Sequence, residues 1–531
     1  LVSEEMLFLV PDDLQRGLQT YAEITSRRME ARIPAEPITG WCSWYFYYTQ
    51  PDEDEIRLNM QFIREEIPGL KLIQLDDGYQ KTVGDWREND RFPSGLAKLA
   101  AEISDAGFTP GIWIAPFVAS EHSELFKSNP DLFVHGEDGR PLRVGNNPLW
   151  LGDYYALDLT NPLVLNRIES EFRLLKEAGF EYFKIDFLYH STVPGKRHNP
   201  RMTRAQALRA GLETIRRVVG DDYVLGCGAP IGSSIGVVDG MRIGTDIAPA
   251  WHYDWGGGVY ECSINTISRS FMHNRWWAND PDCVIVRQSD TELTIDEVQL
   301  WLSVVALSGG LLLVSDRMPD LSSERICMLK KIMPVYGRGG LAVDSLTQKE
   351  PRVFALPIES DMGKWTIAAL LNLSEQQLDI SVPLARLGRE DGPCDLYEFW
   401  KQEYAGRAIG SLEVRGLQPH SVRLYAIRPE RKEPHVLGTS MHFTQGAVEI
   451  SDHKWDATLG ELSFVVHRNT DQEEKVAIIH RGWTLIEATT DAAQCKTQAI
   501  APEVTAVMAK FHNGQTVRAR FSKVGVSQGT L

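Results

Sequence analysis

Residues 180–187 read FEYFKIDF, a short apolar run with a lysine and an aspartate near its end. The stretch before it, 162–178, begins with Pro162, repeats apolar residues at spacings of three and four, and is followed by Gly179. A first-turn proline, an apolar stripe of this period and a closing glycine predict an amphipathic helix. The run that follows is typical of a strand buried on both faces. A helix followed by such a strand is the repeating unit of a parallel sheet.

The same alternation extends from about residue 35 to residue 335. Apolar runs occur at 38–44, 70–77, 108–116, 180–187, 222–228, 237–244, 282–287 and 310–316. Further helical patterns lie at 54–66, 95–106, 203–219, 294–306 and 322–335. Eight such units predict an α/β fold, the closed (β/α)8 TIM barrel. The alternative is an open doubly wound sheet, which requires a glycine-rich phosphate loop where this chain has WCSWYFYY.

After about residue 340 the pattern changes to strand-like runs separated by turn residues, such as RVFALPIE and SVRLYAIRP. The charged sequence PERKEP at 429–434 is typical of a linker. We therefore expect an N-terminal helical segment at 1–35, the barrel at 36–338, a C-terminal antiparallel β-sandwich at 339–430, and a further β-rich region at 431–531.

Composition excludes several classes of protein. The chain has 531 residues, of which 43% are hydrophobic, so it can bury a large core. Its 72 acidic and 55 basic residues give a net charge of −17, which disfavours a nucleic-acid partner. No apolar run reaches the roughly 20 residues that span a bilayer, and the first residues lack a basic segment. We expect a cytoplasmic protein without a membrane partner.

Cysteine and histidine spacing gives no sign of a metal or a cofactor. The seven cysteines contain no CxxC pair, and the histidines form no HxH or HExxH motif. We expect neither a structural zinc site nor a catalytic metal. Cys42 and Cys227 could be nucleophiles, although a cysteine without an obvious paired histidine is more often a small buried side chain.

Charged residues lie where the predicted barrel strands end. Asp76 and Asp77 end the second run, and Lys184 and Asp186 end the fourth. Arg242 and Asp246 follow the sixth, and Asp280 and Asp282 are expected near the start of the seventh strand. Active-site groups of a TIM barrel gather at the carboxyl ends of its strands. We therefore expect these side chains to converge on one site.

Each of these residues also has a structural interpretation. Asp76 and Asp77 could cap a loop or bind a cation, and Asp246 could cap a turn between Gly244 and Pro249. Lys184 and Asp186 point to the same face of a strand and could form a structural ion pair. Buried carboxylates are costly unless paired, so several at one mouth are hard to explain by packing alone.

Aromatic residues accompany the carboxylates. Trp44, Tyr45 and Trp113 lie at or beside the predicted strand ends. Apolar ring faces beside hydrogen-bonding carboxylates suit sugar binding. A pair of carboxylates that can flank one bond suits glycoside hydrolysis.

The motifs occur in a distinctive order: GWCSWY, LDDGYQ with GDW, GIWIAPF, YFKIDFL, LGCGAP, MRIGTDIAP and WWANDPDC. This series, over roughly residues 36–290, resembles the retaining α-galactosidases of glycoside hydrolase family 36, the melibiases, especially the shorter bacterial forms. The resemblance implies that Asp186 is the nucleophile and Asp246 the general acid/base. It also implies that galactose is bound by Asp76, Asp77, Lys184, Arg242, Trp44, Tyr45, Trp113 and Cys227.

The resemblance implies a double displacement on α-galactoside oligosaccharides of the melibiose or raffinose type, with a galactosyl-Asp186 intermediate. Lys184 is expected to act on Asp186 and keep it ionised. Asp246 must carry a proton to act as an acid, so we expect it in a less polar site. Family members also carry a β-sandwich before the barrel, whereas this chain has a helix-like stretch at 12–32, so the rim would be open or completed by another subunit of a homo-oligomer.

Three other functions remain open. An α-N-acetylgalactosaminidase would need room for an acetamido group near Cys227 and Arg242. A galactosyl transglycosylase would use the same carboxylates with a sugar acceptor. A non-catalytic sugar-binding barrel should lack a catalytic carboxylate, and both Asp186 and Asp246 are present.

Overall fold

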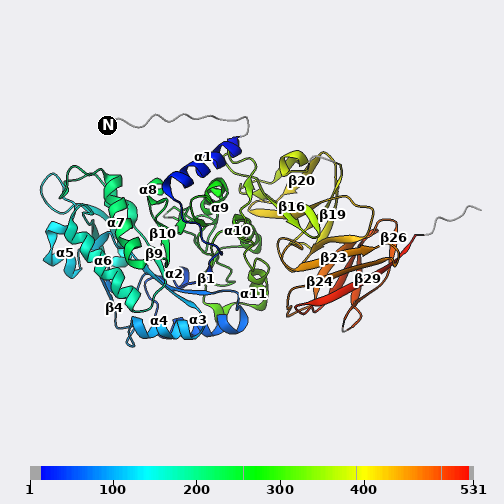
Figure 1. Cartoon of the computed structure of the whole chain (residues 1–531), viewed down its shortest axis with the longest axis horizontal. Coiled ribbons are helices and arrows are strands. Elements are labelled where there is room, and N and C mark those ends of the chain that lie inside the picture. The colour runs from blue at the N-terminus through cyan, green and yellow to red at the C-terminus, as the bar shows by residue number, and fades with distance from the viewer. Residues whose placement is uncertain (1–13, 255, 390–391, 492, 525–531) are drawn as a thin grey trace, which may run out of the picture. The chain divides into compact units, whose positions relative to one another are not determined.

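A computed structural model describes residues 14–254, 256–389, 392–491 and 493–524 of the chain (Figure 1). The chain forms two compact units. The first contains the residues up to Glu292 together with Gly310–Arg325, and the second contains Leu293–Gly309 and the chain from Ile326 onward. The domain limits expected at residues 35, 338 and 430 stay predictions.

The first unit is built on eight parallel strands that form a barrel. These are β1 (Thr39–Cys42), β2 (Leu72–Leu75), β5 (Thr109–Ile114), β9 (Tyr182–Ile185), β10 (Tyr223–Gly226), β11 (Gly240–Arg242), β12 (Ala278–Asp280) and β13 (Leu312–Val314). They pair in the order β12-β11-β10-β9-β5-β2-β1-β13. The amide of Leu311 donates to the carbonyl oxygen of Asn279 at 2.9 Å and links the two ends of this order. The predicted TIM barrel is confirmed.

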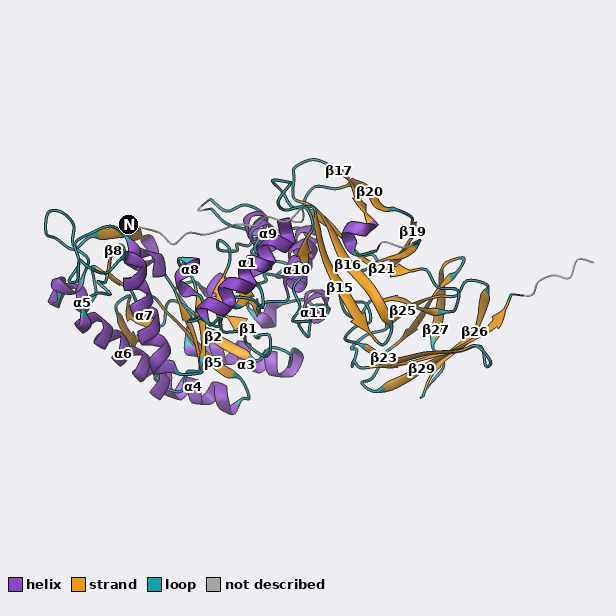
Figure 2. Ribbon diagram, turned by 45° about the horizontal axis from the view of Figure 1, so that its top comes forward, coloured by secondary structure: helices purple, strands orange, loops and turns teal. Residues whose placement is uncertain are grey.

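Helices cover the outside of these strands, as Figure 2 shows for α3, α4, α6 and α7. The helices of the first unit are α1 (Leu14–Met29), α2 (Trp44–Tyr47), α3 (Glu53–Glu66), α4 (Leu96–Asp105), α5 (Glu124–Ser128), α6 (Pro162–Glu177), α7 (Arg204–Val219), α8 (Ile231–Ser234) and α9 (Val259–Ser268). Helix α6 illustrates why they form. The Asn161 side chain accepts from the amide of Leu163, and Pro162 occupies the first turn. Its buried face, with Ile168 and Phe172, packs inward.

The loops after β2 and β5 carry small sheets of their own. A hairpin pairs β3 (Gln80–Thr82) with β4 (Asp85–Glu88). A three-stranded sheet has the order β6-β8-β7, from β6 (Val118–Ser120), β8 (Gly152–Ala156) and β7 (Arg143–Asn147). Both insertions follow carboxyl ends of barrel strands, so they add side chains to that edge of the barrel.

The expected seventh strand at 282–287 is wrong. The strand is Ala278–Asp280, which pairs with β11 in parallel, Arg242 opposite Asp280. Residues 282–287 are buried and carry one isolated bridge, between Val284 and Val314. The apolar run was therefore a poor guide, because pairing with β11 rather than hydrophobicity defines this strand. Asp280 ends the strand instead of preceding it.

The second unit contains antiparallel sheets, the helix α10 (Ile295–Ser308), most of the helix α11 (Ser323–Lys330) and a 3-10 turn at Leu384–Leu387. Helix α10 begins with a capping box between Thr294 and Glu297 and packs against β15, β16 and β21. Helix α11 begins in the first unit and ends in the second. The strands of the first sheet are β14 (Leu341–Ala342), β15 (Val353–Ser360), β16 (Gly363–Asn372), β21 (Ser421–Pro429), β18 (Cys394–Glu398) and β19 (Glu403–Ala408), in that order.

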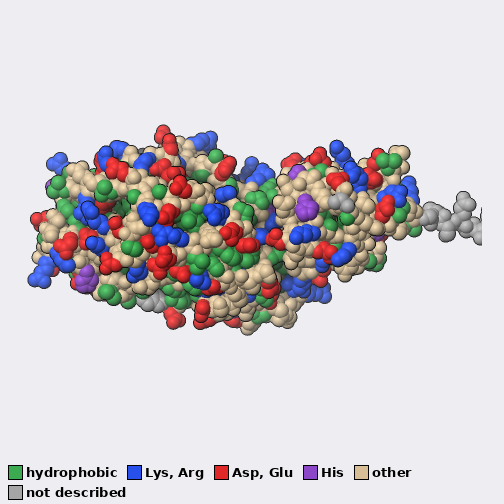
Figure 3. Space-filling view, turned by 90° about the horizontal axis from the view of Figure 1, so that it is seen from below, with side chains coloured by type: hydrophobic (Ala, Val, Ile, Leu, Met, Phe, Trp, Pro, Cys, Tyr) green, Lys and Arg blue, Asp and Glu red, His purple; other side chains and the backbone are tan. Residues whose placement is uncertain are grey.

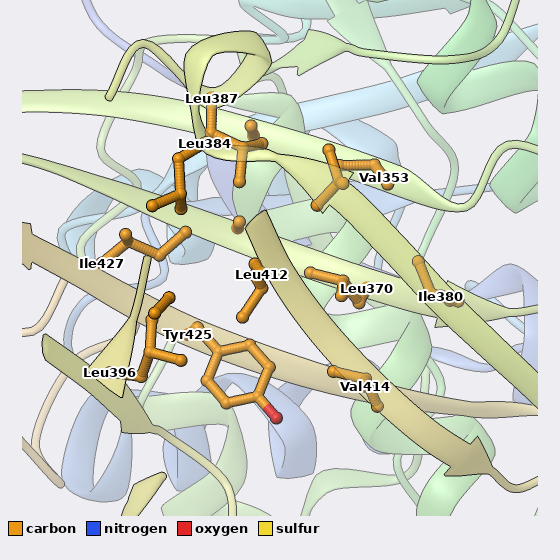
Figure 4. Close-up of a cluster of buried hydrophobic side chains, with 14 of the residues drawn as sticks. Val353, Leu370, Ile380, Leu384, Leu387, Leu396, Leu412, Val414, Tyr425 and Ile427 are labelled. Carbon is orange, nitrogen blue, oxygen red and sulfur yellow. The ribbon is translucent and has the colours of Figure 1, made fainter. Parts of the chain in front are cut away.

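A two-stranded sheet of β17 (Leu378–Pro383) and β20 (Ser411–Leu417) shares a hydrophobic core with the six-stranded sheet. Figure 4 shows Val353 and Leu370 of the large sheet beside Ile380 and Leu412 of the small one. Side chains from two sheets that interleave in one core form a sandwich. The predicted C-terminal β-sandwich region is confirmed.

Two four-stranded sheets complete the second unit. One has the order β22 (His435–Thr439), β25 (Glu474–Ile479), β28 (Val504–Ala509) and β27 (Lys496–Ala501). The other has the order β23 (Ile450–Asp456), β24 (Glu461–Val466), β29 (Gln515–Lys523) and β26 (Trp483–Thr490).

Acidic and basic side chains are interspersed over the face of the molecule shown in Figure 3. Among the described residues, no helix has the length and apolar character needed to cross a bilayer.

Candidate active site

The carboxyl ends of the barrel strands carry most of the residues that the sequence singled out. Asp76 and Asp77 follow β2, Asp186 follows β9 and Cys227 follows β10, while Trp113, Lys184 and Arg242 lie within β5, β9 and β11. Trp44 and Tyr45 open α2 just after β1. Since all eight strands are parallel, these side chains share one edge of the barrel.

A buried ion pair joins two of these strands. The Lys184 Nζ lies 2.9 Å from Asp76 Oδ2, and both side chains are less than a tenth exposed. Gln74 Nε2 donates to the same oxygen at 2.6 Å, and the amide of Asp77 donates to Asp76 Oδ1 at 2.9 Å. Burial lowers the pKa of Lys184, but the charge of Asp76 outweighs it and holds that pKa well above its usual value. The lysine is therefore a permanent cation.

Lys184 does not form the ion pair with Asp186 that was one of the alternative interpretations of these two residues. Lys184 turns its ammonium to Asp76, and the Asp186 carboxylate accepts instead from the indole Nε1 of Trp113 at 3.1 Å and from the amide of Phe187 at 2.6 Å. Hydrogen bonds from N–H groups favour the ionised carboxylate. Both donors to Asp186 are neutral, and the residue stays partly exposed.

Asp77 lies next to this pair in a less favourable environment for charge. Its Oδ1 accepts from Gln80 Nε2 at 2.5 Å and its Oδ2 from Trp150 Nε1 at 2.8 Å. Burial and, to a smaller extent, the charges of Asp76 and Asp186 raise the pKa of Asp77 to about 6, against the lowering effect of the two donors. Three carboxylates therefore lie within electrostatic reach of one another.

A second buried cation organises the other side of the site. Arg242 contacts three carboxylates: Asp246 Oδ1 at 3.1 Å from Nη1, Asp280 Oδ2 at 3.1 Å from Nε, and Asp282 Oδ1 at 2.7 Å from Nη2. Arg242, Asp280 and Asp282 are almost completely buried. The Asp246 side chain is 70% exposed. The expectation of a less polar site for Asp246 is wrong, because this carboxylate faces solvent and a guanidinium.

Cys227 does not have the properties of a nucleophile. It is buried, and burial together with the charge of Asp186 raises the pKa of its thiol well above the usual value. Its neighbour Gly228 has a left-handed backbone (φ 51°), and a Cβ there would lie 3.1 Å from Asp186 Oδ1. The chain therefore passes close to Asp186 without competing chemically with it.

Aromatic rings frame the carboxylates. Trp113 packs edge-on against Trp86, with ring centroids 5.9 Å apart, and lies 6.5 Å from Trp150. The Tyr45 hydroxyl donates to Asp282 Oδ2, and Trp44 is partly exposed 5.6 Å from the ring of Tyr48. Such flat apolar surfaces beside hydrogen-bonding groups suit a sugar ring.

The sequence did not indicate three residues that donate hydrogen bonds within the site. Trp150 lies in a short 3-10 turn of the β5 insertion, and no periodicity marks it. Gln74 and Gln80 lie two and three positions from the aspartates that they contact, and this spacing is their only signal in the sequence. Within the described part of the chain, no group of three or more His, Cys, Asp and Glu side chains is arranged to hold a metal ion.

Comparison with known proteins agrees with this architecture. The melibiase family model matches residues 22–221. TtGalA, the α-galactosidase from Thermus thermophilus solved in complex with stachyose, is 31% identical with a TM-score of 0.55, and the match covers 60% of this chain and 69% of TtGalA. Sequence relatives include the α-galactosidase AgaA of Geobacillus stearothermophilus, 31% identical over 36% of this chain, and an A type blood α-D-galactosamine galactosaminidase of Flavonifractor plautii, 32% identical over 23%.

These matches cover only parts of the curated relatives, 27% of AgaA and 12% of the galactosaminidase. The match to TtGalA is broader and extends over most of that chain. Together with the confirmed barrel, it identifies the family to which the sequence motifs pointed. The chain belongs to the melibiase family.

Proposed function

We propose that the protein is a retaining exo-α-galactosidase that removes terminal α-linked galactose from oligosaccharides of the melibiose or raffinose type. The observation that carries this proposal is the contrast between two carboxylates at one edge of the barrel. The Asp186 carboxylate accepts hydrogen bonds from Trp113 and from the Phe187 amide. Asp246 is exposed to solvent beside Arg242, where it can exchange protons with water.

The proposed roles follow from these environments. Asp186 attacks the anomeric carbon from the β face, while protonated Asp246 donates to the departing glycosidic oxygen. Asp246, now ionised and stabilised by Arg242, then takes a proton from the water that attacks the galactosyl-Asp186 ester. Two inversions at the same carbon return α-galactose.

The buried residues next to Asp186 suit the hydroxyl groups of galactose. Asp76 and Asp77 offer carboxylate oxygens, and Lys184 offers an ammonium donor, all within hydrogen-bonded networks that fix their orientation. Trp113 and Trp44 supply aromatic surface, and the thiol of Cys227 lies within electrostatic reach of Asp186. Preorganised polar groups of this kind bind a sugar without moving.

The activity is tested by hydrolysis of p-nitrophenyl α-galactoside, with the N-acetylgalactosamine analogue and Asp186→Ala assayed in parallel. We expect turnover of the galactoside that disappears in the variant, and α-galactose as the first anomer seen by proton NMR. Preferred cleavage of the N-acetyl analogue would instead support an α-N-acetylgalactosaminidase, and accumulation of oligosaccharides would support a transglycosylase. No turnover of either substrate would contradict the proposal.

A further inference from the structure

Asp282 is a buried carboxylate to which the proposed reaction assigns no role, yet it lies at the centre of the Arg242 side of the site. It is completely buried. Its Oδ1 lies 2.7 Å from Arg242 Nη2 in an ion pair and accepts from the amide of Cys283 at 2.7 Å. Its Oδ2 accepts from the amide of Ile247 at 2.8 Å and from the Tyr45 hydroxyl. Four partners from different parts of the barrel thus meet on one carboxylate.

The backbone at this position is also unusual. Asp282 has a φ of 84°, a left-handed conformation that residues other than glycine rarely adopt. The amide of Asp282 donates to Asp280 Oδ1 at 2.9 Å, which fixes this turn directly after β12. Glycine would relieve the strain but would remove the carboxylate, so the chain keeps a strained residue that bears the charge.

Two of these four partners flank Asp246. Ile247 is the next residue in the chain, and Arg242 is the group to which Asp246 itself is paired at 3.1 Å. One carboxylate therefore holds both the backbone that follows Asp246 and the cation beside it. Arg242 in turn has three carboxylate partners for a single positive charge.

We propose that Asp282 is a positioning residue for Asp246: it fixes the Ile247 amide and the Arg242 guanidinium on either side of Asp246 and shares the charge of Arg242, so that Asp246 can alternate between acid and base. This inference rests on the proposed function, because it assigns that alternation to Asp246. A guanidinium that is shared with fewer carboxylates favours the ionised form of its partner, which cannot donate a proton to a leaving group.

Several titratable or charged groups act on Asp246 from the elements around it. Arg242 of β11 and Asp282 after β12 are the ionic ones, and Tyr45 of α2, Cys227 after β10 and Cys262 of α9 interact with it electrostatically. Burial raises the pKa values of Tyr45, Cys227 and Cys262 well above their usual range, so these three stay neutral near pH 7. Arg242 and Asp282 are therefore the charged groups among these that act on Asp246.

The test is the pH profile of kcat/KM for p-nitrophenyl α-galactoside in the parent and in Asp282→Asn. Removing one negative charge leaves Arg242 less neutralised, which favours the ionised form of Asp246 and lowers the pH at which the acid is lost. We expect the alkaline limb to move to lower pH by about half a unit. Tyr45→Phe, which removes one donor from Asp282 and favours its protonated form, should move the limb the same way by less.

The matched control is Asp316→Asn. Asp316 is also completely buried and pairs with an arginine, Arg287, at 3.1 Å after the next barrel strand. The Asp316→Asn variant should be less stable than the parent, but its alkaline limb should lie at the same pH. The proposal would be overturned if the alkaline limb of kcat/KM lay at the same pH in the parent, in Asp282→Asn and in Tyr45→Phe. A merely structural carboxylate lowers the rate without shifting the pH profile.

A second readout does not depend on turnover. The carboxyl carbon of Asp246 can be followed by carbon-13 NMR in chain labelled at aspartate, with its signal identified by its loss in Asp246→Asn. A lower titration midpoint in Asp282→Asn supports the proposal, and an unchanged midpoint overturns it. If the parent cleaves no galactoside, the proposed activity fails, and this midpoint alone decides the role of Asp282.

Discussion

Lys184 and Arg242 are both buried cations at the same edge of the barrel, but they neutralise different amounts of charge. Lys184 pairs with one carboxylate, Asp76, whereas Arg242 contacts Asp246, Asp280 and Asp282. A balanced, fully buried pair has fixed protonation and suits a group that only binds. Arg242 has an excess of carboxylates, and one of them, Asp246, is 70% exposed to solvent. In the proposed function, the Lys184 side binds the substrate and the Arg242 side transfers protons.

The largest effect on this comparison should come from breaking the balanced pair. Lys184→Met leaves Asp76 buried without its cation, and removal of one partner of a buried ion pair costs about 3–5 kcal/mol. We expect the free energy of unfolding in urea to fall by about that amount. The double variant Lys184→Met with Asp76→Asn removes both charges and should recover part of the loss. Losses that simply add in the double variant would contradict the pairing.

A smaller effect on the free energy of unfolding, and one of opposite sign, is expected from Asp77→Asn. The folded pKa of Asp77, about 6, lies above the unfolded value, so the chain loses stability as pH rises from about 4 to 6. At pH 7 this loss of stability amounts to about 3 kcal/mol. Asp77→Asn avoids the loss, but it removes one hydrogen bond, which costs about 1 kcal/mol.

Asp77→Asn should therefore be more stable than the parent at pH 7 and show a flatter stability profile between pH 4 and pH 6, while turnover falls. Urea unfolding across this pH range measures both. If the variant is less stable than the parent at pH 7, or if its stability falls as steeply with pH, ionisation of Asp77 does not destabilise the folded chain.

The smallest effect should come from Trp150→Phe. It removes the indole donor to Asp77 Oδ2 and keeps an aromatic ring in place. One hydrogen bond is worth about 1 kcal/mol, so kcat/KM for an α-galactoside should fall about fivefold. Trp86→Phe is the matched control, since Trp86 lies against Trp113 as Trp150 does, whereas the side-chain donors to the Asp77 carboxylate are Gln80 and Trp150. Equal losses in both variants would mean that packing rather than the hydrogen bond matters.

The sequence predicted the barrel well because most of its strands are apolar on both faces. The run 180–187 brackets β9 (Tyr182–Ile185), and the proline and glycine around 162–178 mark the ends of α6 closely. The seventh strand failed for a physical reason. Its residues Asn279 and Asp280 are polar and buried, so they do not register as a hydrophobic run.

The sequence predicted where the residues of the candidate site lie, but not which of them form contacts with one another. Parallel strands bring their carboxyl ends to one edge, so Asp76, Lys184 and Asp186 were expected to converge. Their pairing depends on strand register and on insertions, which spacing does not report. Lys184 therefore turned to Asp76, and the donors to Asp186 and Asp77 came from Trp113 and Trp150. The solvent exposure of Asp246 likewise depends on the fold of the loop after β11.

The division of roles between Asp186 and Asp246 is tested most directly by azide rescue of Asp186→Gly and Asp246→Gly with an activated aryl α-galactoside. If Asp186 is the nucleophile, azide replaces it on the β face and its variant yields β-galactosyl azide. If Asp246 is the acid/base, azide attacks the galactosyl-Asp186 ester and that variant yields α-galactosyl azide. Products of the reverse anomeric forms, or the same product from both variants, would contradict the assignment.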